Sequence, residues 1–291
     1  MKQEQMGKLK IVLSMAIFGT IGLLVRNISL PGSVVALARA AVGALFLLAV
    51  VWLRGARTDW QAIRKNLKYL LLSGSALGFN WILLFASYDY TTVAISTLCY
   101  YMAPIMIILT APLVLRERLT IRKILCVVAA LFGMVCLSGV LQGSMPKVTE
   151  LKGILLGLAA AVLYASIVIL NKQLRDISAF DRTIFQLGLS AVLVFFYCLL
   201  TVDMPALQFD TKTVVLLILG GIIHTGLAYY LYFGSIEQVS GQSAAMISYL
   251  DPAIAVLISV FVLGEPMTIF GVLGAVLILG AALLSEYSNR K

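Results

Sequence analysis

The sequence contains 291 residues with a formal net charge of +9, and 61% of its residues are hydrophobic while only 12% are charged. No water-soluble domain of this size can bury so many apolar side chains, so we expect most of them to face lipid or other buried helices. The basic residues lie between apolar segments, where they indicate membrane topology rather than nucleic-acid binding. The composition therefore excludes a soluble domain and predicts an integral membrane protein.

Ten segments of the chain are long and apolar enough to cross a membrane as helices, since crossing needs roughly 20 mostly apolar residues. In chain order they are 9–26, 33–53, 67–88, 93–115, 121–141, 152–171, 183–202, 213–235, 241–263 and 267–285. The first segment is followed by many others, so we do not expect a cleaved signal peptide. The sequence thus predicts an all-α integral membrane protein with ten transmembrane helices.

Lysine and arginine residues in the connections predict the orientation of these helices. If the N-terminus is cytoplasmic, 17 of them lie in cytoplasmic connections and 4 in outer ones. The outer four are Arg26, Lys147, Lys152 and Lys212, and Arg39 alone lies within a span. We therefore expect a multi-pass protein of the cell membrane with both termini in the cytoplasm.

The two halves of the chain resemble each other when one is shifted by 148 residues. The shift places Phe85, Ser87, Tyr101, Pro104, Glu117 and Thr120 on Phe233, Ser235, Tyr249, Pro252, Glu265 and Thr268. Five spans per half is an odd number, so the second half enters the membrane from the opposite face. We therefore expect inverted repeats over residues 1–144 and 145–291, an architecture typical of alternating-access transporters.

Two paired segments, each running from a proline to a glutamate, carry a resemblance to a known family. The segments are YYMAPIMIILTAPLVLRERLT and SYLDPAIAVLISVFVLGEPMT. With ten spans in two halves, the chain resembles the EamA-type members of the drug/metabolite transporter superfamily. The resemblance implies a helical carrier with a central cavity between the halves, often an exporter. Members of the family carry amino acids, amines, sugar derivatives and other metabolites.

Two charged residues lie within the predicted spans, although a charge at mid-bilayer costs roughly 2.5–3.5 kcal/mol on insertion scales. Asp251 is near the middle of its span, and Arg39 lies slightly outward of the middle of its own. They could form a structural ion pair. Alternatively, Arg39 holds a substrate carboxylate, and Asp251 exchanges a proton or holds a substrate amine. The repeat aligns Asp251 with Ala103 and Arg39 approximately with Gln186, so neither charge is duplicated, which favours binding of an asymmetric ligand.

Pro104 and Pro252 lie in the middle of their spans and are predicted hinges or kinks. Each proline removes one backbone hydrogen bond and frees a carbonyl, that of Tyr100 and that of Ser248. Substrate sites of transporters collect at such breaks, which makes Ser248 a candidate contact. The alternative is that the kinks only shape helix packing.

Aromatic side chains gather near the same depth as these prolines. They are Trp81, Tyr100, Tyr101, Tyr164, Tyr229 and Tyr249, and the repeat pairs Trp81 with Tyr229. Their hydroxyl or indole groups need partners, which favours a wall that faces the interior and suits flat or cationic organic solutes. Core packing is the alternative explanation for each of them.

His224 and Asn80 are the remaining polar candidates within the spans. His224 is the only histidine, and an imidazole titrates near neutral pH, which suits a proton relay. The alternative for both residues is a neutral, hydrogen-bonded position in the core. Glu117 and Glu265 occupy matching span ends and are expected to act as caps or hinges, and Asp89 and Glu237 are matching turn residues.

These observations predict a secondary carrier that uses no cofactor. We expect it to export small metabolites, amino acids or related amines, by alternating access, with proton coupling left open. A multidrug or quaternary-amine efflux carrier is the main alternative, and a membrane-embedded enzyme is a weaker one because no nucleophile or metal motif is present. The expected partners are a small-molecule solute and the lipid bilayer, with no nucleic acid, and a homodimer is left open.

Overall fold

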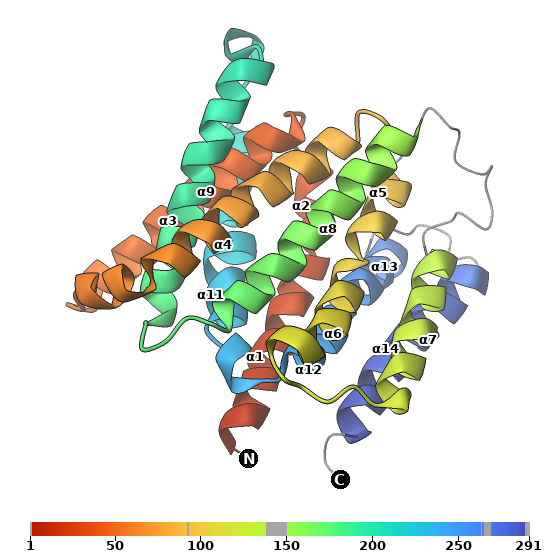
Figure 1. Cartoon of the computed structure of the whole chain (residues 1–291). Helices are drawn as coiled ribbons and strands as arrows, with labels where there is room; N and C mark the ends of the chain where they lie inside the picture. The colour runs from red at the N-terminus through yellow and green to blue at the C-terminus, as the bar shows by residue number, and fades with distance from the viewer. Residues whose placement is uncertain (1, 92, 138–149, 263, 265–268, 289–291) are drawn as a thin grey trace.

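The computed structural model describes residues 2–91, 93–137, 150–262, 264 and 269–288, and these residues form helices without any strand (Figure 1). The prediction of an all-α membrane protein is thus confirmed. The helices of the first half are α1 (Lys2–Gly19), α2 (Ile21–Val25), α3 (Gly32–Leu53), α4 (Trp60–Ser87), α5 (Val93–Tyr100), α6 (Ala103–Val114) and α7 (Ile121–Leu137). The predicted boundary between the halves, at residues 144 and 145, lies outside the described residues, as does Glu265.

The second half contains α-helices, two 3₁₀ turns and one π-helical turn. These elements are α8 (Leu151–Asn171), α9 (Ala179–Thr201), η3 (Met204–Ala206), α10 (Thr211–Gly221), the π-helical η4 (Ile222–Leu227), α11 (Ala228–Phe233), η5 (Ile236–Gln238), α12 (Gly241–Ser248), α13 (Leu250–Phe261) and α14 (Ile269–Ser288).

Several helices begin before the apolar segments that predict them. The segment predicted to start at residue 67 starts as α4 at Trp60, because the side chain of Asp59 accepts hydrogen bonds from the amides of Gln61 and Ala62. Such a cap satisfies amides that have no partner within the helix. Ser178 caps α9 in the same way, and this helix begins at Ala179 instead of the predicted residue 183. Hydropathy alone misses these polar first turns.

Six helical segments of the described residues are long and apolar enough to cross a membrane. They are Gln3–Val25, Gly32–Leu53, Trp60–Ser87, Leu151–Asn171, Ala179–Thr201 and Thr211–Gln238. Shorter apolar helices cover Ala103–Val114 and Ile269–Ala281. The predicted count of ten stays a prediction, because the fourth and ninth predicted segments are each split into two helices and other segments are shorter.

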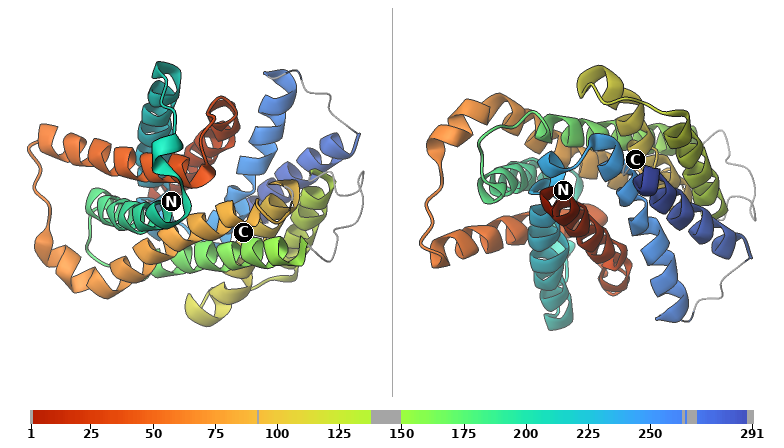
Figure 2. Two further views of the ribbon diagram at one scale, coloured as in Figure 1. Left: turned by 90° about the horizontal axis from the view of Figure 1, so that it is seen from above. Right: turned by 90° about the horizontal axis from the view of Figure 1, so that it is seen from below.

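The packing of the helices follows a pattern that is preserved when the two halves are exchanged. Helix α3 packs on its counterpart α9, and α7 packs on its counterpart α14. Helix α4 packs on α8 as its counterpart α11 packs on α1, and α6 packs on α8 as α13 packs on α1. Figures 1 and 2 show α7 and α14 side by side at one flank of the bundle. Two related halves arranged around a common axis produce this kind of packing pattern.

The two ends of the bundle differ in what they hold. Helix α1 begins and α14 ends at the same end, where N and C are marked in Figure 1. At the other end Lys212 Nζ donates to Asn27 Oδ1 at 2.9 Å, and Lys152 Nζ donates to the Tyr90 hydroxyl at 2.7 Å. Between the ends, large apolar side chains such as Leu45 (64% exposed) point outward, as a lipid-facing surface requires.

Candidate functional site

Helix interruptions gather in one part of the bundle interior. Helix α1 gives way to α2 at Thr20, α5 to α6 at residues 101–102, and α12 to α13 at Tyr249, while η4 interrupts α10 and α11. The interruptions contact one another, because Thr20 is hydrogen-bonded to His224 of η4 and α1 packs on α13. Irregular backbone inside a membrane is tolerated where protein or water surrounds it, and it marks binding sites in transporters.

Pro104 and Pro252 lie directly after two of these interruptions. Pro104 is in the first turn of α6, and Pro252 is in the first turn of α13. A proline lacks the amide hydrogen that would continue the preceding helix, so both helices restart there. Helix α1 approaches the second break closely, since a methyl group at Gly19 would lie 2.9 Å from the Asp251 carbonyl oxygen.

Arg39 is a half-buried cation on α3 that neutral groups hold in place. Its Nε donates to Thr225 Oγ1 at 3.0 Å, and its Nη2 lies 3.5 Å from the His224 carbonyl oxygen. Its guanidinium carbon lies 5.8 Å from the centroid of the Trp81 ring, which is a cation–π contact. Among the described residues no carboxylate forms an ion pair with Arg39.

Asp251 is a half-buried carboxylate at the start of α13 whose side chain interacts with the Tyr101 hydroxyl. Tyr100 and Tyr229 interact electrostatically with both Asp251 and Arg39, which places the two charges around the same pair of rings. The two charges nevertheless form no ion pair with each other, so the structural bridge considered from the sequence is not present.

An unbroken run of aromatic rings joins the two charges. It leads from Tyr101, beside Asp251, through Tyr100, Tyr164, Tyr232, Phe233 and Tyr229 to Trp81, beside Arg39. Successive ring centroids are 5.1 to 6.4 Å apart, within the range of favourable ring contacts. The side chains of Tyr100, Tyr101 and Tyr164 are only partly buried. Tyr232, Phe233 and Tyr229 are buried, so only the part of the run nearest Asp251 is partly accessible.

The other predicted site residues make contacts that anchor helices. Asn80 is fully buried and donates to the Ala160 carbonyl of α8 at 2.6 Å. Ser248 donates to the Ala244 carbonyl of its own helix, and its hydroxyl lies 3.5 Å from that of Tyr232. Tyr249 is fully buried, and no ring contact links it to the aromatic run among the described residues. Asn80 and Ser248 therefore bond to helix backbone, and His224 contacts Arg39 through its carbonyl oxygen.

The model of the EamA-like transporter family matches the chain twice, over residues 5–139 and 151–287. The chain belongs to the EamA-like transporter family. It is 29% identical over 295 residues to the uncharacterized transporter YxxF of Bacillus subtilis (strain 168), covering 98% of this chain and 90% of the relative. It is 26% identical over 282 residues to an uncharacterized transporter of Archaeoglobus fulgidus, covering 96% of each.

A solved crystal structure superposes on this EamA-like transporter with a TM-score of 0.85 over 96% of this chain and 98% of the other. The identity is 18%, so this likeness shows the fold alone. The family and the apolar helices together show a multi-pass membrane transporter and not an enzyme.

Four residues of this transporter's site, Thr20, Thr225, Tyr232 and Phe233, were not predicted as site residues from the sequence. Thr225 and Thr20 hold Arg39 and His224, and Tyr232 connects Tyr164 to Phe233 in the aromatic run. Tyr232 follows Tyr229 by one helical turn, so helical spacing could have identified it. The threonines gave no signal, because threonine is ordinary in apolar helices.

A group of three charged residues and one glutamine at the end bearing the termini connects the first half to the second. We call Glu117, Lys123, Lys172 and Gln242 the clasp. Glu117 accepts from the amides of Gly241 and Gln242 at 2.6 and 3.0 Å, so it caps the N-terminus of α12 from the other half. Lys123 donates to the Gln242 side chain, and Lys172 Nζ lies 3.9 Å from Glu117. Burial lowers the pKa of Lys172, and the charge of Glu117 opposes that effect.

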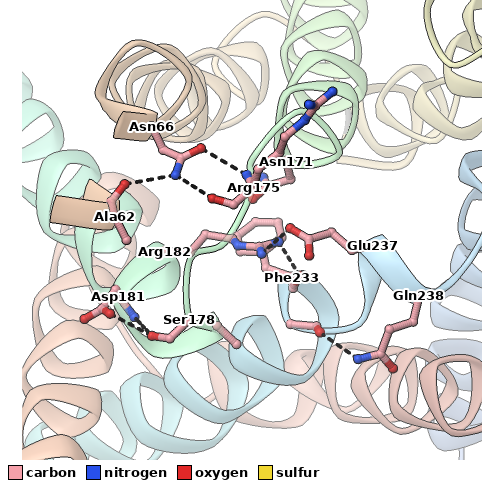
Figure 3. Close-up of polar contacts among 12 residues, drawn as sticks. Ala62, Asn66, Asn171, Arg175, Ser178, Asp181, Arg182, Phe233, Glu237 and Gln238 are labelled. Carbon is pink, nitrogen blue, oxygen red and sulfur yellow. Dashed lines mark hydrogen bonds and ion pairs between the residues drawn. The ribbon is translucent and has the colours of Figure 1, made fainter. Parts of the chain in front are cut away.

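Arg182 holds the neighbouring turn η5 (Figure 3). Because the seventh predicted segment starts at residue 183, Arg182 was expected in the connection before it. It lies instead in the first turn of α9 and is only 2% exposed. Its Nη1 donates to the Phe233 carbonyl at 2.9 Å, and its Nη2 pairs with Glu237 at 2.5 Å. The same view shows Asn66 of α4 bonded to the backbone of Arg175. Buried polar contacts therefore close this end of the bundle.

Proposed function

We propose that this EamA-like transporter carries small dipolar metabolites, with amino acids and related amines as the solute class. The observation that supports the proposal is the arrangement of Arg39 and Asp251, two half-buried opposite charges that do not pair and that one run of aromatic rings connects. Charges inside a membrane are costly unless they serve a ligand, a partner or a pathway. A solute with a carboxylate and an ammonium group supplies a partner for each of them.

We further propose that the carrier is an exporter of the cell membrane that works by alternating access of its two halves, with a proton gradient as the driving force. The packing pattern that both halves share supports alternating access, since inverted halves can rock around a midplane site. The excess of basic residues at the end bearing the termini supports a cytoplasmic location for that end. A homodimer and the absence of a nucleic-acid partner stay predictions.

The experiment that tests the proposal compares matched solutes. Purified protein is titrated with an amino acid, its decarboxylated amine and its deaminated acid, and melting temperature and proteoliposome flux are recorded. For leucine the analogues are 3-methylbutylamine and 4-methylpentanoate, and the comparison is repeated for polar and cationic amino acids. We expect the zwitterions to bind best. Arg39→Gln should abolish the preference for a carboxylate, Asp251→Asn should abolish the preference for an amine, and Arg26→Gln at the outer end serves as control.

A quaternary-amine efflux carrier is the second candidate, and the aromatic run beside Asp251 favours it, because aromatic rings bind organic cations. Binding of choline or a related quaternary amine with higher affinity than any zwitterion, unchanged in Arg39→Gln, would replace the first proposal with this one.

A further inference from the structure

The π-helical turn η4 is pressed against the face of α3 that bears Arg39. Val42, Gly43 and Phe46 lie one and two turns along this face from Arg39, and all three contact η4 or its flanking glycines. A methyl group at Gly43 would lie 3.0 Å from the amide of Gly226, so the two backbones touch. Single π-turns within α-helices occur frequently at functional sites, and this one has its position fixed by close packing.

The turn occupies one edge of the Arg39 guanidinium and leaves the other edge open. A guanidinium has five N–H donors, and two adjacent ones, on Nε and Nη2, are directed at Thr225 Oγ1 and the His224 carbonyl. The remaining donors, on Nη1 and Nη2, form the end-on edge and have no hydrogen-bond acceptor among the described residues. Two parallel donors are the arrangement that binds a carboxylate in bidentate fashion.

His224 fixes the turn to the interruption of α1. The Thr20 hydroxyl has a single hydrogen, which it donates to the Ile17 carbonyl at 2.7 Å. In the 2.8 Å contact with His224, Thr20 Oγ1 must therefore accept, so His224 Nε2 carries the proton and donates. The contacts connect Thr20, His224, Thr225 and Arg39 in one chain, and the orientation of the guanidinium depends on it.

We propose that η4 makes the carrier selective for carboxylate-bearing solutes and that Thr225 is the positioning residue that directs the end-on edge of Arg39 at the carboxylate. The inference rests on the proposed function, since it takes Arg39 as the residue that touches the solute. It adds the turn and the residue that set the geometry of carboxylate binding by Arg39. Thr225 is fully buried, so it acts through Arg39 and not by direct contact.

The test removes the hydroxyl of Thr225 at constant shape. The probe is the most tightly bound of the twenty amino acids together with its carboxamide, and both dissociation constants are measured on the full-length protein. In Thr225→Val we expect the Kd of the acid to rise about tenfold, the effect of losing one hydrogen bond to a charged group, while the Kd of the amide stays within about twofold. Thr225→Ser should restore the preference for the acid.

Thr183→Val is the matched control, because Thr183 is an equally buried threonine whose hydroxyl, among the described residues, bonds only to its own helix. If Thr225→Val does not purify, Thr225→Ala takes its place, because alanine lacks the same hydroxyl. Equal weakening of acid and amide would mean a merely structural role and would overturn the inference. So would a wild-type protein that binds none of the twenty amino acids.

The inference and the function on which it rests fail in different ways. If Arg39→Lys reduces the preference for the acid and Thr225→Val does not, the inference is wrong and the proposed function stands. If neither change affects that preference, Arg39 does not bind the solute and the proposed function fails with the inference.

Discussion

Arg39 and Asp251 each contact neutral groups and form no ion pair with each other, which distinguishes them from a pair retained for stability. Thr225 and the His224 carbonyl contact Arg39, and Tyr101 contacts Asp251. A stabilising role predicts direct contact, because removing one member of a buried ion pair costs roughly 3–5 kcal/mol. Because the two side chains do not pair, each charge is available to a solute.

A double-mutant cycle on the two charges tests this separation. We expect the losses of stability in Arg39→Ala and Asp251→Ala to add in the double variant, with a coupling free energy below about 0.5 kcal/mol. Denaturation of the purified protein in detergent measures the change in the free energy of unfolding for each single variant and for the double variant. Recovery of stability in the double variant would show that the two residues pair directly after all.

The carboxylate of Asp251 is the group that we expect to carry the transported proton. Asp251→Asn keeps the shape and removes the titratable group, so the protein should express normally and either lose transport or lose its dependence on a pH gradient. Flux into proteoliposomes with and without an imposed gradient measures both effects, and Asp203→Asn at the outer end is the control. Wild-type flux with an unchanged response to the gradient would exclude Asp251 from coupling.

At the scale of elements, some helix interruptions could be predicted from the sequence and others could not. Pro104 and Pro252 predicted two of them, since proline removes a backbone donor wherever it occurs. The π-turn and the break at Thr20 depend on contacts between residues far apart in the chain. Arg39 and Thr225 are 186 positions apart, and Thr20 and His224 are 204 apart. The local sequence 222–227 reads IIHTGL, and no residue in it is specific to a π-turn.

We expect the clasp to stabilise the end of the bundle at which it lies. Glu117→Gln keeps the side-chain length but removes the charge that faces the N-terminus of α12 and Lys172. Hydrogen bonds to charged groups contribute roughly 1.5–3 kcal/mol, so we expect a loss of about that size and a lower melting temperature. Glu4→Gln removes an exposed helix-surface pair with Lys8 and serves as control. An unchanged melting temperature in Glu117→Gln would show that α12 does not depend on this cap.

At the scale of the whole molecule, the shift of 148 residues predicted two related halves, and the packing of the helices agrees with it. The site breaks this symmetry. Gln186, which aligns approximately with Arg39, donates to Ser73 and Asn171, so the second half has a neutral amide where the first has a cation. The sequence revealed this asymmetry because a charge inside a span is rare. It could not reveal the neutral contacts that orient Arg39, because they form only between folded helices.

The orientation of the molecule in the membrane is the remaining prediction at this scale. We expect the end bearing the termini to face the cytoplasm, because 17 lysine and arginine residues fall on that side and 4 on the other. Arg57 and Gln208 are exposed and lie in connections assigned to opposite sides. In a background without the four native cysteines, an impermeant thiol reagent should label Gln208→Cys in intact cells and Arg57→Cys only after permeabilisation. The reverse pattern would show that the carrier has the opposite orientation, with the clasp on the outer side of the membrane.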